Sequence, residues 1–185
     1  MPRFSRSRPA FRAVALAVGT MLVLSGCNDD TRISQCPGAA IRADAAVHPV
    51  LKQGAAATDP SAVLYTVRVT GIETNCTLDR RVGQTDSNVT LTFRATRAPN
   101  GQAARYVVPY FLAINQGQRI INKRAFNLQV DFGPGVSSVT VQTAINDTLL
   151  KLENGRLPSD YQFLAGMPLS ATEQAYVKAM GPYTP

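Results

Sequence analysis

Three segments of the chain alternate apolar and polar residues with a period of two, and this pattern limits the fold more than any other feature. They are residues 63–70, 88–97 and 125–132. Successive side chains of a β-strand point to opposite faces of the sheet, so such alternation is typical of strands with one buried face. Several strands of this kind bury their apolar faces only by packing sheet against sheet, which predicts a β-sandwich.

Turn residues and apolar runs predict further strands. Asn100-Gly101 tolerates the positive φ of tight hairpins and predicts a return strand over residues 105–115. That strand reads as a continuous apolar run, typical of a strand covered on both faces. It contains Pro109, which cannot donate a hydrogen bond to a neighbouring strand and therefore predicts an edge or a bulge at that position.

The remaining segments complete an all-β prediction. One strand is expected within residues 36–52, and others at 136–143, 147–152 and 161–165, with a polar loop at 77–87. Residues 147–152 also fit helical spacing. Ser170 and Glu173 form a capping box that predicts a short helix ending at Gly181. The prediction is an immunoglobulin-like sandwich of about seven or eight strands with a C-terminal helix, without the tryptophan of antibody cores.

The N-terminus resembles the signal of a bacterial lipoprotein. Its first twelve residues carry four arginines and no acid, and residues 13–24 form an apolar run shorter than the roughly 20 residues of a membrane-spanning helix. Leu24-Ser25-Gly26-Cys27 follows and resembles a lipobox. The resemblance implies cleavage before Cys27 and acylation of Cys27, which anchors the chain to membrane lipid. The alternatives are an uncleaved anchor and an ordinary signal peptide.

These segments predict three parts: a signal peptide at 1–26, a lipidated tether at 27–35 and a folded domain at 36–185. As a flexible coil the tether reaches roughly 16 Å, which holds the domain close to the bilayer. In some bacteria an Asp directly after the lipidated cysteine retains lipoproteins in the inner membrane. Asn28 occupies that position here, which favours the outer membrane mildly over the inner one.

The other two cysteines predict a disulfide. An exported chain enters an oxidising compartment, where Cys36 and Cys76 are free to pair. The loop between them spans about 40 residues, and in the chain-entropy model closing it contributes about 4 kcal/mol. The signal holds four of the 19 Lys and Arg residues, so the mature chain has 15 bases and 12 acids, or +3. That balance argues against a nucleic-acid partner.

Candidate chemistry is sparse. The single histidine, His48, has no accompanying GxSxG motif and is expected at a strand end or in a loop rather than in a catalytic site. The acids are scattered, so neither a metal nor a cofactor is expected. Arg68 and Arg94 are expected on outward strand faces and Arg80 and Arg81 in a loop. These four arginines form either ordinary solvated surface or a basic patch that binds lipid or an acidic partner.

A second, looser resemblance covers most of the mature chain. Cys36-Pro37, Tyr65-x-Val67-x-Val69, Cys76, Pro109-Tyr110-Phe111 and Gly166-x-x-Leu169-Ser170 are similar to segments of small uncharacterised envelope lipoproteins, which imply no activity. The predicted function is a membrane-anchored, non-enzymatic binding or scaffolding module of the periplasm, with an envelope protein as partner. A small-molecule or glycan binder is the alternative, and a hydrolase is the third.

Overall fold

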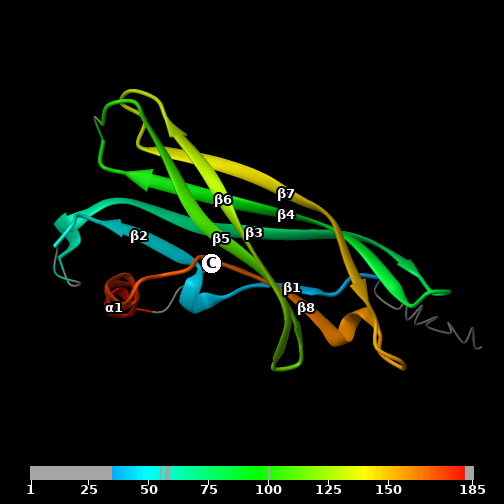
Figure 1. Ribbon diagram of the computed structural model, residues 1–185. Helices are drawn as coiled ribbons and strands as arrows, with labels where there is room; N and C mark the ends of the chain where they lie inside the picture. The colour runs from blue at the N-terminus through cyan, green and yellow to red at the C-terminus, as the bar shows by residue number, and fades with distance from the viewer. Residues whose placement is uncertain (1–34, 55, 57–58, 100, 182–185) are drawn as a thin grey trace, which may run out of the picture. The chain divides into compact units, whose positions relative to one another are not determined.

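The computed structural model describes residues 35–54, 56, 59–99 and 101–181, and within them it contains eight β-strands in two four-stranded sheets (Figure 1). The first sheet has the order β1 (Gly38–Ile41), β8 (Tyr161–Gly166), β5 (Ala104–Gln116), β6 (Arg119–Phe132). The second has the order β2 (Val47–Leu51), β3 (Val63–Asp79), β4 (Gln84–Arg97), β7 (Ser138–Lys151). The described part also contains three 3-10 turns, η1 (Ala43–Ala45), η2 (Pro60–Ala62) and η3 (Pro158–Asp160), and the helix α1 (Ala171–Met180).

The two sheets form a β-sandwich in which most strand pairs are antiparallel. Strands β3 and β4 form one hairpin and β5 and β6 another, while β7 returns to pair with β4 and β8 returns to pair with β5. All these pairs are antiparallel, whereas β1 lies parallel to β8. The predicted all-β sandwich with a short C-terminal helix is confirmed.

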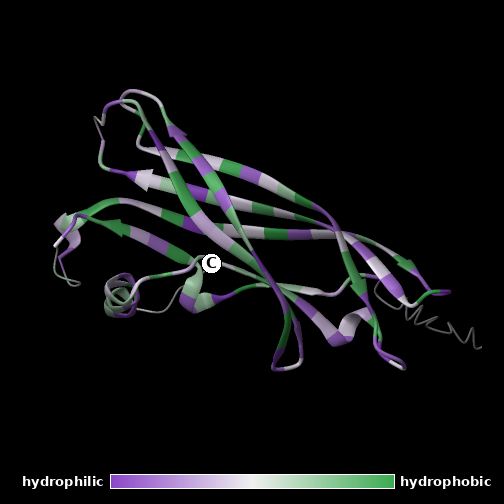
Figure 2. Cartoon of the chain, viewed as in Figure 1, coloured by the Kyte–Doolittle hydropathy of each residue, from purple (hydrophilic) through white to green (hydrophobic). Residues whose placement is uncertain are grey.

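Alternation along the strands builds the core between the sheets, and Figure 2 shows it as a change of hydropathy from residue to residue. Every second residue of the predicted segments is buried or half-buried, and the fully buried ones include Val67 and Val69 of β3, Leu91 and Phe93 of β4, and Val130 of β6. The outward residues between them are mostly polar and exposed. The predicted inward faces are therefore confirmed.

Strand β5 is covered on both faces, as its apolar run predicts. Leu112 and Ile114 join the core between the sheets, while Phe111 and Ala113 pack on the opposite face against Ala45 of η1. Both faces of the strand are thus buried at once, which explains the five consecutive buried residues Tyr110–Ile114.

Pro109 lies where β5 changes from an inner strand to an edge. The β8 partner ends at Gly166, opposite Phe111, so β5 is paired on both sides only from Phe111 onward. Pro109 pairs with Asn127 of β6 on the other side, and the register irregularity of this pair falls at Ile114 and Asn115 instead. The prediction of an edge at Pro109 is confirmed, and the alternative of a bulge there is wrong.

The polar stretch 77–87 is not a loop. Strand β3 continues to Asp79, strand β4 begins at Gln84, and only residues 80–83 turn the chain. The inward residues of this part of β4 are Thr85 and Ser87, both buried. Because the inward side chains here are hydroxyls, this part of the strand lacks the apolar alternation that predicts a strand.

Three further expectations differ from the structure. Residues 36–52 hold two short strands, β1 and β2, separated by η1. Residues 147–152 are no separate strand but continue β7 past a bulge, where Asp147 has φ 53° and its amide donates to Asn88 Oδ1. The connection at Asn100-Gly101 is no hairpin either, because β4 and β5 lie in different sheets.

Candidate functional site

A cleft of about 850 Å³ lies beside α1, where the helix, η1 and the hairpin of β5 and β6 meet. Phe111 of β5, Met167 and Val177 of α1 supply apolar lining. Met167 follows β8 directly, and its amide donates to the carbonyl of Ala45, which fixes this segment against η1. This wall of the cleft is therefore held in place by a backbone hydrogen bond between the segment after β8 and η1.

The helix beside the cleft is fixed at its N-terminus by the predicted capping box. The Ser170 hydroxyl accepts from the amide of Glu173, and Glu173 Oε2 accepts from the amide of Ser170 at 2.7 Å. These two bonds satisfy amides that a helix start otherwise leaves unpaired. The predicted helix and its cap are confirmed.

His48 connects this cap to the edge strand β2. Its Nδ1 lies 3.1 Å from the carbonyl oxygen of Pro168, and its Nε2 lies 3.6 Å from Glu173 Oε1. The ring is buried, so it holds the beginning of α1 against β2. Both ring nitrogens face acceptors of the helix start, and a histidine in this position acts as a structural contact.

The rim of the cleft carries more bases than acids. Arg42, Lys123 and Lys178 lie on it, and Asp44 is the one acid among the described residues that line it. Asp44 forms an ion pair with Arg42, whose Nε lies 2.7 Å from Asp44 Oδ1. This hydrogen-bonded guanidinium holds the pKa of the Asp44 carboxyl below its usual value. Lys123 Nζ lies 4.1 Å from the centre of the Phe111 ring. The cleft therefore combines apolar lining with a positive rim.

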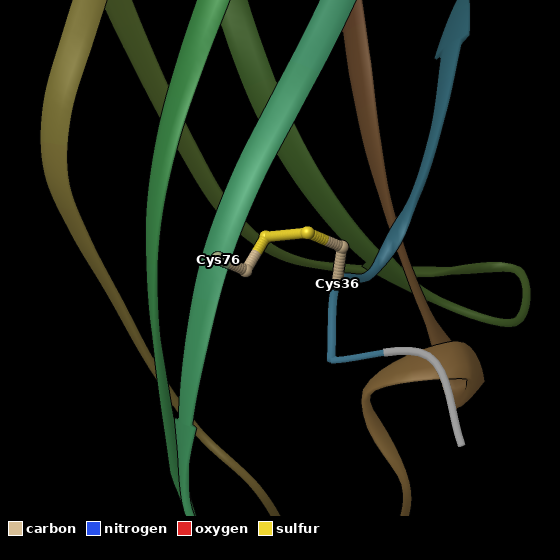
Figure 3. Close-up of a disulfide and its surroundings, with 2 residues drawn as sticks. All are labelled: Cys36 and Cys76. Carbon is tan, nitrogen blue, oxygen red and sulfur yellow. A yellow bond between two sulfur atoms is a disulfide. The ribbon is translucent and has the colours of Figure 1, made fainter. Parts of the chain in front are cut away.

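The predicted disulfide joins Cys36 to Cys76, with a Cα–Cα distance of 5.2 Å (Figure 3). Cys76 lies on β3 three residues before that strand ends, and Cys36 lies just before β1. The bridge thus ties the start of the folded chain to the far end of the longest strand. This prediction is confirmed.

The arginines considered from the sequence are separated from the cleft. Arg68 and Arg94 are exposed and directly opposite each other on β3 and β4, and Arg80 and Arg81 lie in the turn between these strands, as predicted. The turn borders a second hollow of about 530 Å³, which is also lined by Lys151 and Arg156.

Sequence reasoning missed the cleft itself. Its lining comes from four distant segments around residues 42–45, 111, 123 and 167–181. No local motif joins these segments, because the cleft arises from how α1 packs against η1 and β2. The partial signal was the apolar run of β5, whose outward Phe111 needs a cover.

The predicted signal peptide at 1–26, Cys27 and nearly all of the predicted tether lie outside the described residues. Within the described part, no helix is long and apolar enough to cross a membrane. The described residues also contain no group of three or more His, Cys, Asp or Glu side chains arranged to hold a metal ion.

Comparison of the chain with protein-family models, with curated proteins and with solved structures finds no match. Function is therefore inferred from the residues and from the geometry of the cleft.

Proposed function

We propose that the protein is a membrane-anchored, non-enzymatic binding module of the bacterial cell envelope, and that its ligand is an amphipathic anion held in the cleft beside α1. Acylated Cys27 anchors it to the periplasmic side of a membrane, the outer membrane in preference to the inner one. The observation that carries the proposal is the combination of apolar lining and positive rim in a cleft of about 850 Å³. A cleft of this volume suits a ligand of small-molecule size.

The chemistry of the lining selects the ligand class. Phe111, Met167 and Val177 favour an apolar body, while Lys123 and Lys178 favour an acidic head group at the rim. Among the described residues, neither lysine forms an ion pair with a carboxylate. An acyl chain or ring system that ends in a carboxylate, sulfonate or phosphate satisfies both requirements.

The same residues argue against the two other functions. The side chain of His48 is engaged by Pro168 and Glu173, so it is poorly placed to act as a general base. Glycan binding uses exposed aromatic rings, and each aromatic side chain of the described residues is buried or half-buried. Binding of an apolar anion remains the function that the site supports best.

Fluorescence of 1-anilinonaphthalene-8-sulfonate, an apolar aromatic anion, tests the cleft. We expect enhanced emission when the probe is added to the protein, with displacement by oleate. Lys123→Gln together with Lys178→Gln is expected to weaken probe binding about fivefold, because exposed charge pairs are each worth a fraction of a kcal/mol. Ala43→Trp, at the mouth of the cleft, is expected to block the probe.

Lys151→Gln is the matched control, because it removes a lysine far from the cleft and is expected to leave probe binding unchanged. Equal binding by all variants would contradict the proposed site. Failure of the probe to bind, with recovery of one envelope protein after crosslinking in intact cells, would replace the small ligand by a protein partner.

Anchoring is tested separately at Cys27. Cys27→Ala is expected to accumulate as an unprocessed precursor that takes up no labelled palmitate, because the thiol that receives the lipid is gone. Ser25→Ala keeps a small residue before the cysteine and is the control that should label normally. Normal labelling of Cys27→Ala would end the anchoring proposal.

A further inference from the structure

The turns at the disulfide end of the sandwich meet one another. Leu152, after β7, donates its amide to the carbonyl of Gly83 in the turn between β3 and β4. Glu153 accepts from Arg119 and Gln116, which flank the turn between β5 and β6, at 2.8 Å in each case. Three connections are thereby held together at this end, which lies toward the lower right in Figure 1. Their exposed basic and apolar side chains are called the tip: Arg80, Arg81, Val82, Arg119, Ile120, Lys151, Arg156 and Leu157.

Large apolar side chains are exposed at the tip. Val82 is 60% exposed, Ile120 51% and Leu157 45%. Ile121 and Leu149 are exposed on the adjoining strands, so more than half of the exposed large apolar residues of the described part lie here. Scattered single residues of this kind are ordinary on a soluble surface, whereas a concentration at one end marks a contact surface.

The same connections are basic, and their acids are engaged. Residues 79–84, 116–121 and 151–160 hold five bases and three acids. Asp79 accepts from the amide of Arg81, and Asp160 accepts from the amide of Leu157. Hydrogen bonds from Gln116 and from Arg119 hold the pKa of Glu153 below its usual value. Arg80, Arg81, Lys151 and Arg156 surround the hollow of about 530 Å³ between two of the connections.

The folded chain also begins at this end. The disulfide ties Cys36 to Cys76, and along an extended strand Arg80 lies only about 13 Å beyond Cys76. Cys36 lies nine positions after Cys27, so the tether spans at most about 30 Å when fully extended. A lipid on Cys27 therefore holds the tip, rather than the opposite end of the sheets, near the bilayer.

We propose that the tip docks on the surface of an anionic phospholipid bilayer, and this inference rests on the proposed anchoring through Cys27. Val82, Ile120 and Leu157 enter the boundary between head groups and acyl chains, while the arginines and Lys151 contact lipid phosphates. Apolar side chains and bases together are what binds a protein surface to anionic membranes. The opposite end of the sandwich, around Tyr65 and Arg97, then points away from the lipid.

A single introduced tryptophan tests the orientation, because the chain contains none. The full lipidated protein with Val82→Trp is reconstituted into vesicles of phosphatidylglycerol and phosphatidylcholine whose acyl chains are brominated. We expect blue-shifted emission and quenching of at least about twofold, since side chains at this depth reach the acyl boundary. Val136→Trp, in the connection between β6 and β7 at the opposite end, is the matched control and should not be quenched.

Leu157→Trp provides a second position at the tip, and each variant is first compared with wild type by its thermal unfolding transition. Co-flotation with the vesicles reports anchoring independently of quenching. Co-flotation without quenching at either tip position would overturn docking and leave anchoring intact, while absence of co-flotation would overturn both. Equal quenching in vesicles of pure phosphatidylcholine would overturn the selection for anionic lipid.

Discussion

The two ends of the sandwich are held together by different means. At the end where β3 begins, Tyr65 stacks on Tyr106 with ring centres 4.0 Å apart, and Tyr106 meets the edge of the Phe132 ring. At the end where β3 finishes, the inner face carries the buried hydroxyls of Thr85, Ser87 and Thr148. None of these three hydroxyls finds a hydrogen-bond partner among the described residues. One end thus has a cluster of stacked aromatic rings. The inner face of the other end mixes buried hydroxyls with apolar side chains such as Leu150 and Tyr161, beside a disulfide.

Arg97 completes the aromatic end. Its guanidinium lies 4.6 Å from the centre of the Phe132 ring and donates to four backbone carbonyls in the two connections that cross between the sheets. The acceptors are the carbonyls of Gly101, Gln102, Gly133 and Val136. A Cβ on Gly101 would lie 2.7 Å from the Arg97 guanidinium carbon, so a larger residue there would displace the guanidinium. Non-covalent contacts fix this end, whereas the polar end has a covalent bond in addition to its hydrogen bonds.

Removal of the disulfide should have the largest effect. Cys36→Ser with Cys76→Ser is expected to lower the free energy of unfolding by about 4 kcal/mol, because the unfolded chain loses a 40-residue constraint. Urea denaturation measures the loss, and reduced wild type should match the double variant. Mass spectrometry without reductant should find the two cysteine peptides linked in protein from the exported compartment. Two free thiols there would refute the bridge.

Replacement of Arg97 tests the other end. Arg97→Met is expected to lower the free energy of unfolding by about 2–3 kcal/mol, because four carbonyls lose a charged donor. Arg94→Met, on the outward face of the same strand, is the control and should change it by less than about 0.5 kcal/mol. Equal effects of the two substitutions, measured by thermal or urea unfolding, would show that Arg97 does not fix the connections.

The buried hydroxyls predict a stabilising substitution. Thr148→Val keeps the shape of the side chain and removes a buried polar group without a partner, so a gain of about 1 kcal/mol in the free energy of unfolding is expected. Thr140→Val changes an exposed threonine of the same strand and should have little effect. A loss of stability in Thr148→Val would mean that its hydroxyl is hydrogen-bonded in solution.

The aromatic end should also respond to alkaline pH. Burial, followed by the nearby Tyr106 and Glu173, raises the pKa of Tyr65. The folded protein therefore favours the neutral form of Tyr65. The stabilisation by this neutral form is complete below the usual tyrosine pKa of about 10, and it is lost as the pH rises through the pKa of Tyr65 in the folded protein. Urea midpoints measured from about pH 9 to 11 should fall less steeply in Tyr65→Phe than in wild type. Parallel curves would contradict this assignment.

The same contrast explains how far the sequence could predict the structure. Around Tyr65, Phe93 and Phe126 the apolar alternation is strong, and the strands and their inward faces were predicted correctly. Around Thr85 and Ser87 the inward residues are polar, so that part of the β3–β4 hairpin was mistaken for a loop. The pairing of Cys36 with Cys76 was predictable because only two cysteines remain once Cys27 is assigned to the predicted lipid anchor.

The cleft required the structure. Phe111, Lys123 and Val177 are far apart in the chain and come together only because α1 packs against β2 through His48 and Glu173. The tip likewise gathers three separate turns, although Arg80 and Arg81 were singled out from the sequence. Periodicity describes single strands, whereas both surfaces depend on which strand ends meet.

Native-state hydrogen exchange on oxidised and reduced protein is the most direct test of whether the disulfide holds the polar end together. We expect amides of residues 65–69 and 91–95 to lose only the protection that corresponds to the lower global free energy of unfolding. Amides of residues 76–88 and 145–152 should lose more, because reduction lets this end open locally. Such a difference would locate the stabilising effect of the bridge at the end that carries the tip. An equal loss of protection at both ends, or no loss at either, would contradict the account.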